Sequence, residues 1–489
     1  MKRLSASLLL IAALTAGLAP SASAHRAAFP AGDLPNAQGA PFNPVAIDAH
    51  KTRIFLPLHH VTIRKQDAKI GSWQMELTGT GLGTCSLERG IDRGALHYLR
   101  IQSFEGRTYI HADWRYAAPV HVTVGRAGIQ IVFEHRLAPA VFHPVAPGVA
   151  YWEGQRWNGA GPMRVRALKL DPHEIQLETA VATPGAAHMG LAPVSRIAWA
   201  HGAIAAVNGG YFSPRTGEPQ GEVIAHHELI SRTMCDRPAF WVERDGSAYV
   251  KMKKPYAEIA TEDGGTLRCQ AVNEQARRDR VTLYTDEFGP STRTIPDPSR
   301  WEFAITGNGL VVDQGYGNLP IPKGGVVVSG QGKGYVRLRD VLGYGQHVHV
   351  KYSFGDDVVA AVGGGPTLLH DGRFQTPQTH YAPDIVFGRA PRTAIGITGD
   401  GHYLMVCVDG RRPGYSVGAT IKELAATLRS LGAKEALNLD GGGSTTMWLR
   451  GHVLNRPSDG SERSVSTALL AVPRNRAVAS ALTNLLADR

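Results

Sequence analysis

Two aspartates in similar local surroundings are the first residues of this chain that could do chemistry. Asp409 follows the apolar run Tyr403–Val408, and Asp440 follows Ala436–Leu439 and opens the sequence Asp-Gly-Gly-Gly-Ser. Such a pair of carboxylates suits cleavage of a bond whose leaving group is a phosphate. One carboxylate can activate water or stabilise an oxocarbenium-like centre, while backbone N–H groups and arginine hold the phosphate oxygens. Arg392, at the start of a predicted strand, is the arginine that best fits this role.

A short apolar strand that runs into a glycine cluster occurs three times after residue 200. The clusters are Asn208-Gly209-Gly210, Gly363-Gly364-Gly365-Pro366 and the glycines after Asp440. Consecutive glycines let the backbone turn sharply and approach a ligand closely, and their exposed N–H groups can form a nest that binds an anion. A single cluster is typical of a tight turn. Three of them predict loops that surround one cleft at one side of a sheet.

The segment between the two aspartates predicts the elements that position them. Thr420 can cap a helix with Glu423 as its capping-box partner, and Gly432 can end it. The apolar face of this helix is expected to hold Ile421, Leu424, Ala425, Leu428 and Leu431. A right-handed strand–helix–strand crossover would bring Asp409 and Asp440 to the carboxyl ends of neighbouring parallel strands. Further on, Arg450-Gly451 between two short apolar runs predicts a two-residue hairpin.

The domain organisation follows from a change of pattern near residue 149. Residues 25–148 are predicted to form a β-rich module with a connector, because short alternating runs are separated by turn signals. These runs are Arg53–Leu56, Trp73–Leu77, His97–Ile101, Tyr109–Ala112 and Ile129–Phe133. Residues 149–475 are predicted to be the catalytic domain and residues 476–489 a C-terminal tail. The predicted fold class is an α+β or mixed α/β catalytic domain with glycine-rich loops at strand ends, preceded by a small all-β domain.

Residues 1–24 have the pattern of a cleavable signal peptide. Lys2 and Arg3 precede the apolar stretch Leu8–Leu18, and Ala22-Ser23-Ala24 matches a cleavage site. We therefore expect a cut after Ala24 and a secreted or periplasmic protein. The stretch is too short to span a membrane, and no later run reaches about 18 apolar residues, so membrane insertion is not expected.

The charge favours some partners and disfavours others. The net charge of +10 becomes +8 without Lys2 and Arg3, because 50 basic side chains then face 42 acidic ones. A modest positive charge fits solubility or attraction to an anionic polymer. The basic residues are scattered and lack interleaved aromatic residues, so no nucleic-acid partner is expected. The oligomeric state stays open.

The four cysteines predict no metal site. Cys85, Cys235, Cys269 and Cys407 lack metal-binding spacing, and neither a metal nor another cofactor is expected. In an oxidising compartment Cys235 and Cys269 are the favoured disulfide pair, because both lie in turn-rich polar surroundings. Cys407 lies in an apolar run and is expected to be a buried thiol.

The ordered motifs resemble the phosphodiester glycosidase family, which includes the N-acetylglucosamine-1-phosphodiester α-N-acetylglucosaminidases. The motifs are Asn208–Phe212, Gly363–Pro366, Arg392–Gly396, Asp409–Arg411, Asn438–Thr446, Pro457–Asp459 and Arg463–Thr467, and the resemblance covers about Val149–Pro473. It implies hydrolysis of a sugar-1-phosphodiester, such as an N-acetylglucosamine-1-phosphodiester, to free sugar and phosphomonoester. A role in cell-envelope or exopolysaccharide metabolism suits the predicted signal peptide.

The resemblance also implies which residues line the site. Asp440, Asn208 and Arg392 match motif positions expected in the pocket. As a hypothesis, the catalytic acid and nucleophile are assigned among Asp440, Asp409 and Glu222. The residues expected to bind substrate are Asn208, Gly209, Gly210, Gly364, Gly365, Arg392, Asn438, Gly441, Gly442, Gly443, Ser444, Thr445, Asp459 and Arg463.

The main alternative is a non-catalytic protein of the envelope that binds an anionic polysaccharide with the same pocket. The presence of Asp440 and Asp409 favours the enzyme, because a carboxylate near a phosphate would cost a pure binder electrostatic repulsion. Serine-hydrolase chemistry has less support, since Ser444 lacks the second glycine of the G-x-S-x-G elbow.

Overall fold

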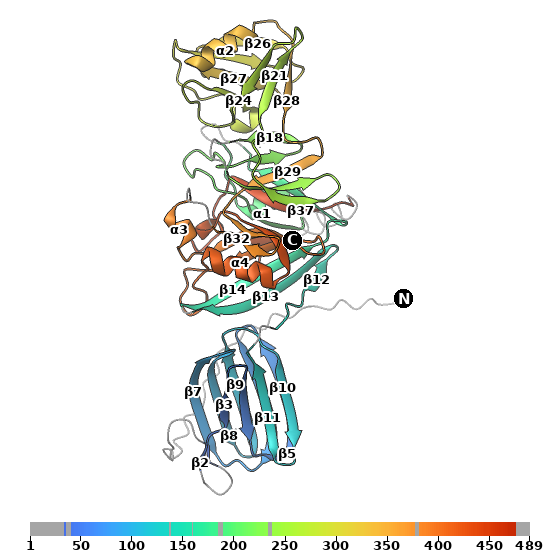
Figure 1. The fold of residues 1–489 in the computed structure, drawn as a ribbon, viewed down its shortest axis with the longest axis vertical. Helices are drawn as coiled ribbons and strands as arrows, with labels where there is room; N and C mark the ends of the chain where they lie inside the picture. Colours follow the sequence, from blue (N-terminus) through green and yellow to red (C-terminus); the bar gives the residue numbers. More distant parts are fainter. Residues whose placement is uncertain are drawn as a thin grey trace, which may run out of the picture.

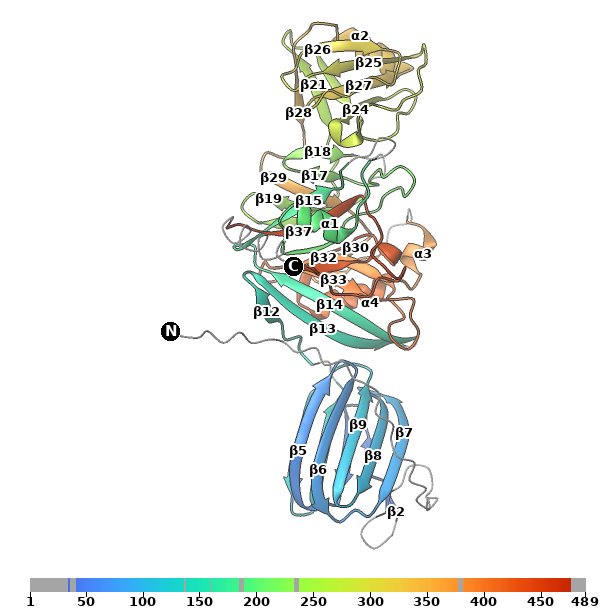
Figure 2. The same ribbon diagram turned by 180° about the vertical axis from the view of Figure 1, so that it is seen from behind.

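The computed structural model describes residues 34–35, 41–135, 138–158, 160–183, 189–232, 237–376 and 381–475. The predicted signal peptide, the C-terminal tail and Cys235, with its predicted bridge to Cys269, lie outside the described residues. Three bodies follow one another along the long axis of the molecule (Figures 1 and 2). The N-terminal strands form one end, the sheets that carry the glycine clusters form the middle, and a smaller β body forms the other end.

The fold is mainly antiparallel β-sheet, with 51% strand and 9% helix. Among the described strand pairs, only β23 (Ala271–Val272) and β24 (Val281–Thr285) run parallel. The predicted α+β or α/β class is therefore wrong. Apolar strands that end in glycine do suggest α/β folds, but here such strands are buried by other sheets rather than by helices on both faces.

The N-terminal body is a sandwich of two antiparallel sheets. One has the order β10-β11-β4-β3 and the other β5-β6-β9-β8-β7. Each of the five predicted runs lies in a strand, and inward residues from both sheets share one core, in which Trp73 meets Phe133 edge to face at 5.2 Å. The bounds are β1 Leu34–Pro35, β2 Pro41–Phe42, β3 Val45–Ile47, β4 Lys51–Leu56, β5 His59–Lys69, β6 Ser72–Thr80, β7 Cys85–Arg93, β8 Leu96–Phe104, β9 Arg107–Trp114, β10 Val120–Gly125 and β11 Gly128–Glu134.

The middle body contains three antiparallel sheets. Their orders are β12-β13-β14-β33-β32-β34-β30-β31, β15-β37-β16-β35-β36 and β18-β17-β29-β19-β20. The bounds of the first sheet are β12 His143–Ala146, β13 Val149–Asn158, β14 Gly161–Leu170, β30 Thr367–His370, β31 Arg373–Phe374, β32 Arg392–Thr398, β33 Tyr403–Val408 and β34 Ala433–Asn438. Those of the other two are β15 Ile175–Val181, β16 Ala205–Asn208, β17 Val223–Ala225, β18 Glu228–Ser231, β19 Ala239–Glu243, β20 Ala248–Lys251, β29 Val358–Gly363, β35 Met447–Leu449, β36 His452–Val453 and β37 Thr467–Pro473.

The continuous apolar run of β33 reflects burial of the eight-stranded sheet on both faces. Tyr403, Met405 and Cys407 point into a core shared with the two five-stranded sheets. Leu404 and Val406 point to the opposite face, which helix α4 (Ile421–Ser430) covers. Cys407 is a buried thiol as predicted, and burial raises its pKa to about 12.

Helix α4 confirms the predicted start and apolar face, but the crossover differs from the prediction. The capping box of Thr420 and Glu423 is present in full. Strands β33 and β34 point the same way because β32 lies between them, antiparallel to both. The two aspartates therefore follow strand ends on the same side of the sheet, but these strands are not neighbours. The predicted hairpin is present, with β35 and β36 joined by Arg450-Gly451.

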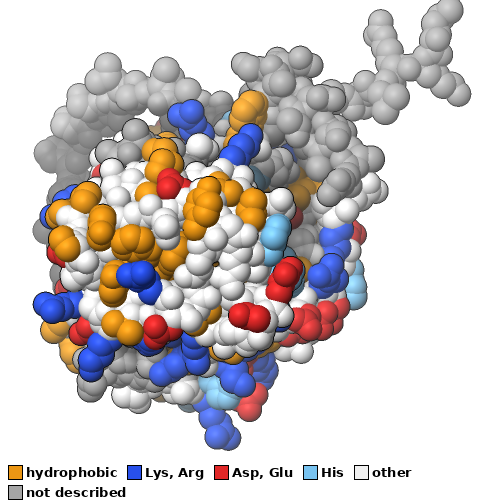
Figure 3. All heavy atoms as spheres, turned by 90° about the horizontal axis from the view of Figure 1, so that it is seen from above, with side chains coloured by type: hydrophobic (Ala, Val, Ile, Leu, Met, Phe, Trp, Pro, Cys, Tyr) orange, Lys and Arg blue, Asp and Glu red, His pale blue; other side chains and the backbone are white. Residues whose placement is uncertain are grey.

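The third body carries none of the three glycine clusters described above. Its sheets are β22-β21-β28 and β23-β24-β27-β25-β26, and one core extends from them to the sheet of β17 and β19. Figure 3 views this end, where hydrophobic side chains lie between basic ones; the most exposed large hydrophobic residues of this body are Ile295, Tyr316, Val336 and Tyr344.

The remaining elements of the third body are β21 Ala257–Thr261, β22 Thr266–Cys269, β25 Arg300–Ile305, β26 Val311–Gly315, β27 Val326–Gln331, β28 Val348–Tyr352 and α2 Lys333–Val341. Short helices α1 (Val194–Ala200) and α3 (Pro383–Val386) belong to the middle body, and no helix among the described residues is long and apolar enough to cross a membrane.

The capping box gives a test of local stability. We expect Thr420→Ala to destabilise α4 by about 1 kcal/mol, because the Glu423 N–H loses its acceptor and the helix start loses half of its capping box. Hydrogen exchange should then be about five-fold faster for the amides of α4 that open locally. Lys422→Ala, an exposed change in the same turn, is the control. Equal exchange in both variants would contradict a stabilising role for the cap.

Candidate active site

Three charged residues lie together where β33 and β34 end and β32 begins, in the middle of the eight-stranded sheet. Arg392 begins β32, opposite Val408 at the end of β33, so it lies next to Asp409. On its other side, the N–H of Leu439 donates to the carbonyl of Thr393, which places Asp440 directly beyond the same strand ends. The sequence predicted that both aspartates follow the carboxyl ends of strands on one side of a sheet, and they do, although the sheet is antiparallel.

The three glycine clusters meet at these strand ends, and each cluster follows a strand of a different sheet. The N–H of Asp440 donates to the carbonyl of Gly209 at 3.1 Å, and that of Gly365 donates to the carbonyl of Asn438 at 2.7 Å. A Cβ at Gly210 would lie 2.1 Å from the carbonyl oxygen of Gly363, and one at Gly364 would lie 2.4 Å from that of Asn438. Glycine is needed at these positions because the three chains touch through their backbones.

The glycines after Asp440 do not present an open row of N–H groups. The N–H of Gly441 donates to the Asp440 carboxylate, and that of Gly442 to the carbonyl of Pro391. Further along, the N–H groups of Ser444 and Thr445 donate to carbonyls within the same loop. Most donors of the expected anion nest are thus used to shape the loop, so the positive charge for an anion must come from side chains.

Two arginine side chains border this loop on its exposed side. Arg463 donates twice to Asp459, at 2.6 and 3.0 Å, and the pair lies against Gly443, where a Cβ would collide with both side chains. Arg411 lies 3.8 Å from Asp459 and is also the nearest side chain to Gly442. Both guanidinium groups are about half exposed. They can therefore receive an anion from solvent beside Asp440.

Asp440 is a desolvated carboxyl group at the centre of this arrangement. Its Oδ1 accepts the Gly441 N–H at 2.9 Å. Burial raises the pKa of Asp440, because a charged carboxylate is less stable away from water. The hydroxyl of Ser444, the Gly441 N–H and the charge of Arg463 act in the opposite direction and favour the ionised form. A carboxyl group with this balance can change its protonation state in the course of a reaction.

A network of amides and one tyrosine holds Asp440 in place. Asn208 is fully buried, donates to the Asp440 carbonyl at 2.8 Å, and accepts from the Thr393 hydroxyl at 2.7 Å. Asn438 donates to the Tyr211 hydroxyl at 2.8 Å, and Tyr211 in turn donates to the carbonyl of Gly365 at 2.7 Å. Asn208 and Asn438 thus position the backbone around Asp440 rather than face solvent.

Arg392 uses most of its donors on the protein. It is 4% exposed, and its Nε and Nη2 donate to the carbonyls of Ala419, Ile385 and Gly388. Burial lowers the pKa of Arg392 from its ordinary value. Its guanidinium therefore fixes the loop before β32 rather than facing an open site.

Asp409 is almost completely enclosed by partners. It is 1% exposed, its Oδ2 accepts from Arg166 at 2.5 Å and from the Tyr415 hydroxyl at 2.9 Å, and its Oδ1 accepts the Arg456 N–H at 2.9 Å. This arrangement is that of a structural ion pair. Of the predicted carboxylates, Asp440 is the one whose surroundings leave it most available for chemistry.

Glu222 borders the glycine cluster that begins at Gly363, because the Gly363 N–H donates to the Glu222 carbonyl. Near it lie residues that the sequence did not single out. Glu222 is 3% exposed. Burial raises the pKa of the nearby Tyr381 hydroxyl to about 12, Arg237 lowers this pKa, and Glu222 makes a smaller contribution that raises it. Arg237 lies over the rings of both Tyr211 and Tyr381, at 5.1 and 5.7 Å. Tyr211 belonged to a quoted motif, but no spacing or composition signal pointed to Arg237 or Tyr381. Among the described residues, no group of three or more His, Cys, Asp or Glu side chains is arranged to hold a metal ion.

Part of this chain matches a known protein family. Residues 299–472 match the family model of phosphodiester glycosidases. The resemblance seen in the sequence is thereby confirmed for that part of the chain, which includes Asp440, Asp409 and Arg392 but neither Asn208 nor Glu222. The match supports a hydrolase of this family.

Two solved structures share the fold of this chain, and a third gives a lower score. The chain is similar to a hypothetical protein from Synechocystis, with a TM-score of 0.60 at 22% identity over 89% of this chain and 82% of that one. It is also similar to a protein of Burkholderia pseudomallei K96243, with a TM-score of 0.53 at 22% identity over 92% of this chain and all of that one. The catalytic domain of zebrafish N-acetylglucosamine-1-phosphodiester alpha-N-acetylglucosaminidase, auto-inhibited by its pro-peptide, gives a TM-score of 0.40 at 18% identity over 69% of this chain and 87% of that one.

One curated relative has a short match. The SPbeta prophage-derived uncharacterized protein YomE of Bacillus subtilis (strain 168) is 36% identical over 105 residues. These residues are 22% of this chain and 16% of that protein. The match therefore concerns one segment of a much longer relative.

The Arg166–Asp409 pair gives a prediction that separates structure from catalysis. Arg166→Met leaves a buried carboxylate without its counter-ion, so we expect a loss of about 3–5 kcal/mol in the free energy of unfolding. The other acidic partner of Arg166 is Glu153, which is 35% exposed, and Glu153→Gln should cost less than about 1 kcal/mol. Thermal unfolding of the two variants checks this difference. Similar melting temperatures would mean that Asp409 does not depend on Arg166.

Proposed function

We propose that this protein is an exported glycosidase that hydrolyses the glycosidic bond of a sugar-1-phosphodiester, such as an N-acetylglucosamine-1-phosphodiester, in cell-envelope or exopolysaccharide metabolism. The observation that carries the proposal is the position of Asp440. This desolvated carboxyl group lies where three glycine loops meet, with Arg463 and Arg411 on the exposed side of its loop. The family match over residues 299–472 supports the reaction class.

The arrangement suits departure of a phosphate from the sugar. In the proposed reaction the bond between C1 and the phosphate oxygen breaks, and its electron pair leaves with the phosphomonoester. Water supplies a hydroxyl group to C1 and a proton to the medium. Arg411 and Arg463 can stabilise the charge that develops on the leaving phosphate, because hydrogen bonds between guanidinium and phosphate are charge-assisted and often bidentate.

Asp440 can act on the sugar carbon C1, from which the phosphate departs. An ionised carboxylate next to C1 stabilises the oxocarbenium-like transition state or attacks it as a nucleophile. A phosphomonoester is a stable anion, so its departure needs positive charge more than it needs a proton. In this proposal Asp440 works in its ionised form, and Tyr211 and Asn438 keep the surrounding loops in place.

Product analysis tests the proposal. Purified residues 25–489 should convert an N-acetylglucosamine-1-phosphodiester to free N-acetylglucosamine and a phosphomonoester, and oxygen from labelled water should appear in the sugar. Asp440→Asn should lower kcat by about 10²- to 10⁴-fold. Its melting temperature at neutral pH should be unchanged or higher, because the variant removes a buried charge.

The other outcomes of this experiment contradict the proposal. Sugar-1-phosphate as the product, with the label in phosphate, would indicate a phosphodiesterase. Saturable binding of several sugar phosphodiesters without turnover would favour the polysaccharide-binding alternative. Full turnover by a folded Asp440→Asn protein would remove Asp440 from the catalytic residues.

The pKa of Asp440 predicts a pH dependence. Burial raises this pKa above the ordinary 3.8, so activity should increase with pH as Asp440 loses its proton, with a midpoint above that value. Arg463 lowers the pKa of Asp440, so Arg463→Gln should move the midpoint to higher pH. The pH profile of kcat/KM measures both effects. Arg429→Gln, on the exposed side of α4, should leave the midpoint unchanged, and an unchanged midpoint in Arg463→Gln would contradict the coupling.

A further inference from the structure

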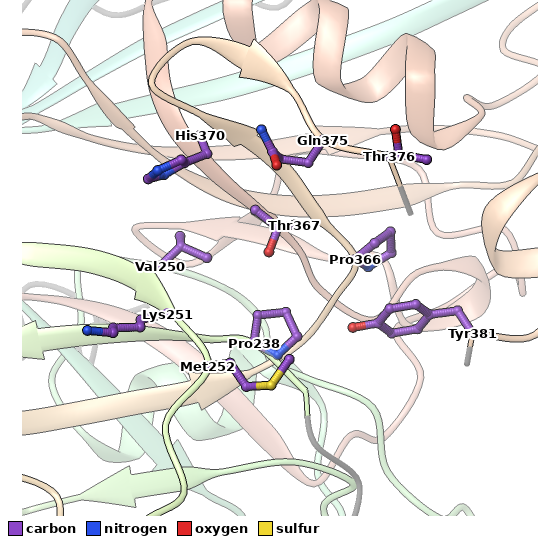
Figure 4. A pocket seen from close by; sticks show the side chains of 10 residues that line it. All are labelled: Pro238, Val250, Lys251, Met252, Pro366, Thr367, His370, Gln375, Thr376 and Tyr381. Carbon is purple, nitrogen blue, oxygen red and sulfur yellow. The ribbon is translucent and has the colours of Figure 1, made fainter. Parts of the chain in front are cut away.

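A pocket lies beside the candidate active site, and none of its lining residues was given a role in the reaction proposed above. It has a volume of about 280 Å³ and lies between β20, β30 and Tyr381 (Figure 4). This volume is just below the range of about 300–1,000 Å³ typical of small-molecule pockets, so it suits a single ring rather than a long chain.

The lining of this pocket has the chemistry of a site for a charged sugar ring. Pro238, Met252 and Pro366 offer apolar surface, and the hydroxyl groups of Thr367 and Tyr381 point toward the space between them (Figure 4). Sugar rings present apolar C–H groups on a face and hydroxyl groups at the edge, which is the pattern that such a lining complements.

The charge of the pocket favours an anion. Lys251 and His370 lie on the side of the pocket opposite Tyr381, one on each side of Val250 (Figure 4), and none of the described residues that line the pocket is acidic. His370 is held through Nδ1 by Glu435 at 3.1 Å, and this hydrogen bond raises the pKa of His370. Glu435 offsets part of the positive charge but lies behind the imidazole, outside the lining.

The pocket and the active site share a wall. Tyr381 lines the pocket, and its ring is faced by Arg237, which also lies over Tyr211. Pro366 follows directly on the glycine cluster whose backbone bonds to Asn438. A ligand that fills the pocket is therefore separated from the surroundings of Asp440 by one layer of residues.

We propose that this pocket binds one ring of a negatively charged glycan, so that the substrate is a polymer with a neighbouring anionic unit held at Lys251 and His370. The inference rests on the proposed function for the reaction at Asp440. It narrows the substrate from any sugar-1-phosphodiester to a chain in which negatively charged units repeat.

The test compares a short and a long substrate. The short one is the methyl phosphodiester of N-acetylglucosamine 1-phosphate, and the long one is a trimer of N-acetylglucosamine 1-phosphate units joined by phosphodiesters. In Lys251→Met and in Val250→Trp, which fills the pocket, the ratio of KM for the trimer to KM for the methyl diester should rise about ten-fold, as expected for loss of one charge-assisted hydrogen bond. Lys351→Met, on the third body, should leave this ratio unchanged.

Binding to the Asp440→Asn protein keeps the inference testable apart from turnover. Titration calorimetry should show trimer binding that becomes about ten-fold weaker when Val250→Trp is added. An unchanged KM ratio, equal trimer affinity with and without Val250→Trp, or no trimer binding at all would overturn the inference. If neither substrate is cleaved while trimer binding still responds to Val250→Trp, the proposed reaction fails and the pocket assignment stands.

Discussion

The side chain of Asn208 is the contact on which the rest of the site depends. Its amide group is fully buried, donates to the Asp440 carbonyl, and accepts from the Thr393 hydroxyl and the Thr446 N–H. These partners belong to β32 and to the loop after β34, whereas Asn208 itself ends β16 in another sheet. Because a buried polar group without a partner is costly, one amide group fixes the positions of three segments. This contact joins two of the three glycine clusters, the one at Asn208 and the one after Asp440.

The sequence predicted the local elements well and the sheet poorly, for a physical reason. The capping residues of α4, the apolar run of β33 and the Arg450-Gly451 hairpin all depend on near neighbours in the chain, and each is present in the structure. Strand pairing depends on distant residues. The insertion of β32 between β33 and β34 leaves no mark in the segment between Asp409 and Asp440, so a strand–helix–strand pattern suggested a parallel sheet that does not form.

The same limit applies to the site. The motifs that contain Asp440, Asn208 and Arg392 lie at the ends of strands, and the structure brings these three residues close together. Arg166 and Arg237 reach the site region from strands and loops remote in sequence, and no spacing or composition rule links them to it. The surroundings of Asp409 could not be predicted either. Its bond to Arg166 crosses from β14 to the end of β33, and only the pairing of these two strands makes it possible.

The segment Gly363–Pro366 separates the surroundings of Asp440 from the pocket lined by Tyr381. The carbonyl of Gly365 accepts from Tyr211 and Asn438 on the side of Asp440, whereas that of Gly364 lies 3.5 Å from the Tyr381 hydroxyl, on the side of the pocket in Figure 4. Gly365 has a φ of +124°, and a Cβ there would lie 1.8 Å from the Tyr381 oxygen, so only glycine lets the tyrosine close this wall. A shift of this backbone on one side must therefore move hydrogen-bond acceptors on the other, which links the surroundings of Asp440 to the pocket through a single strand end.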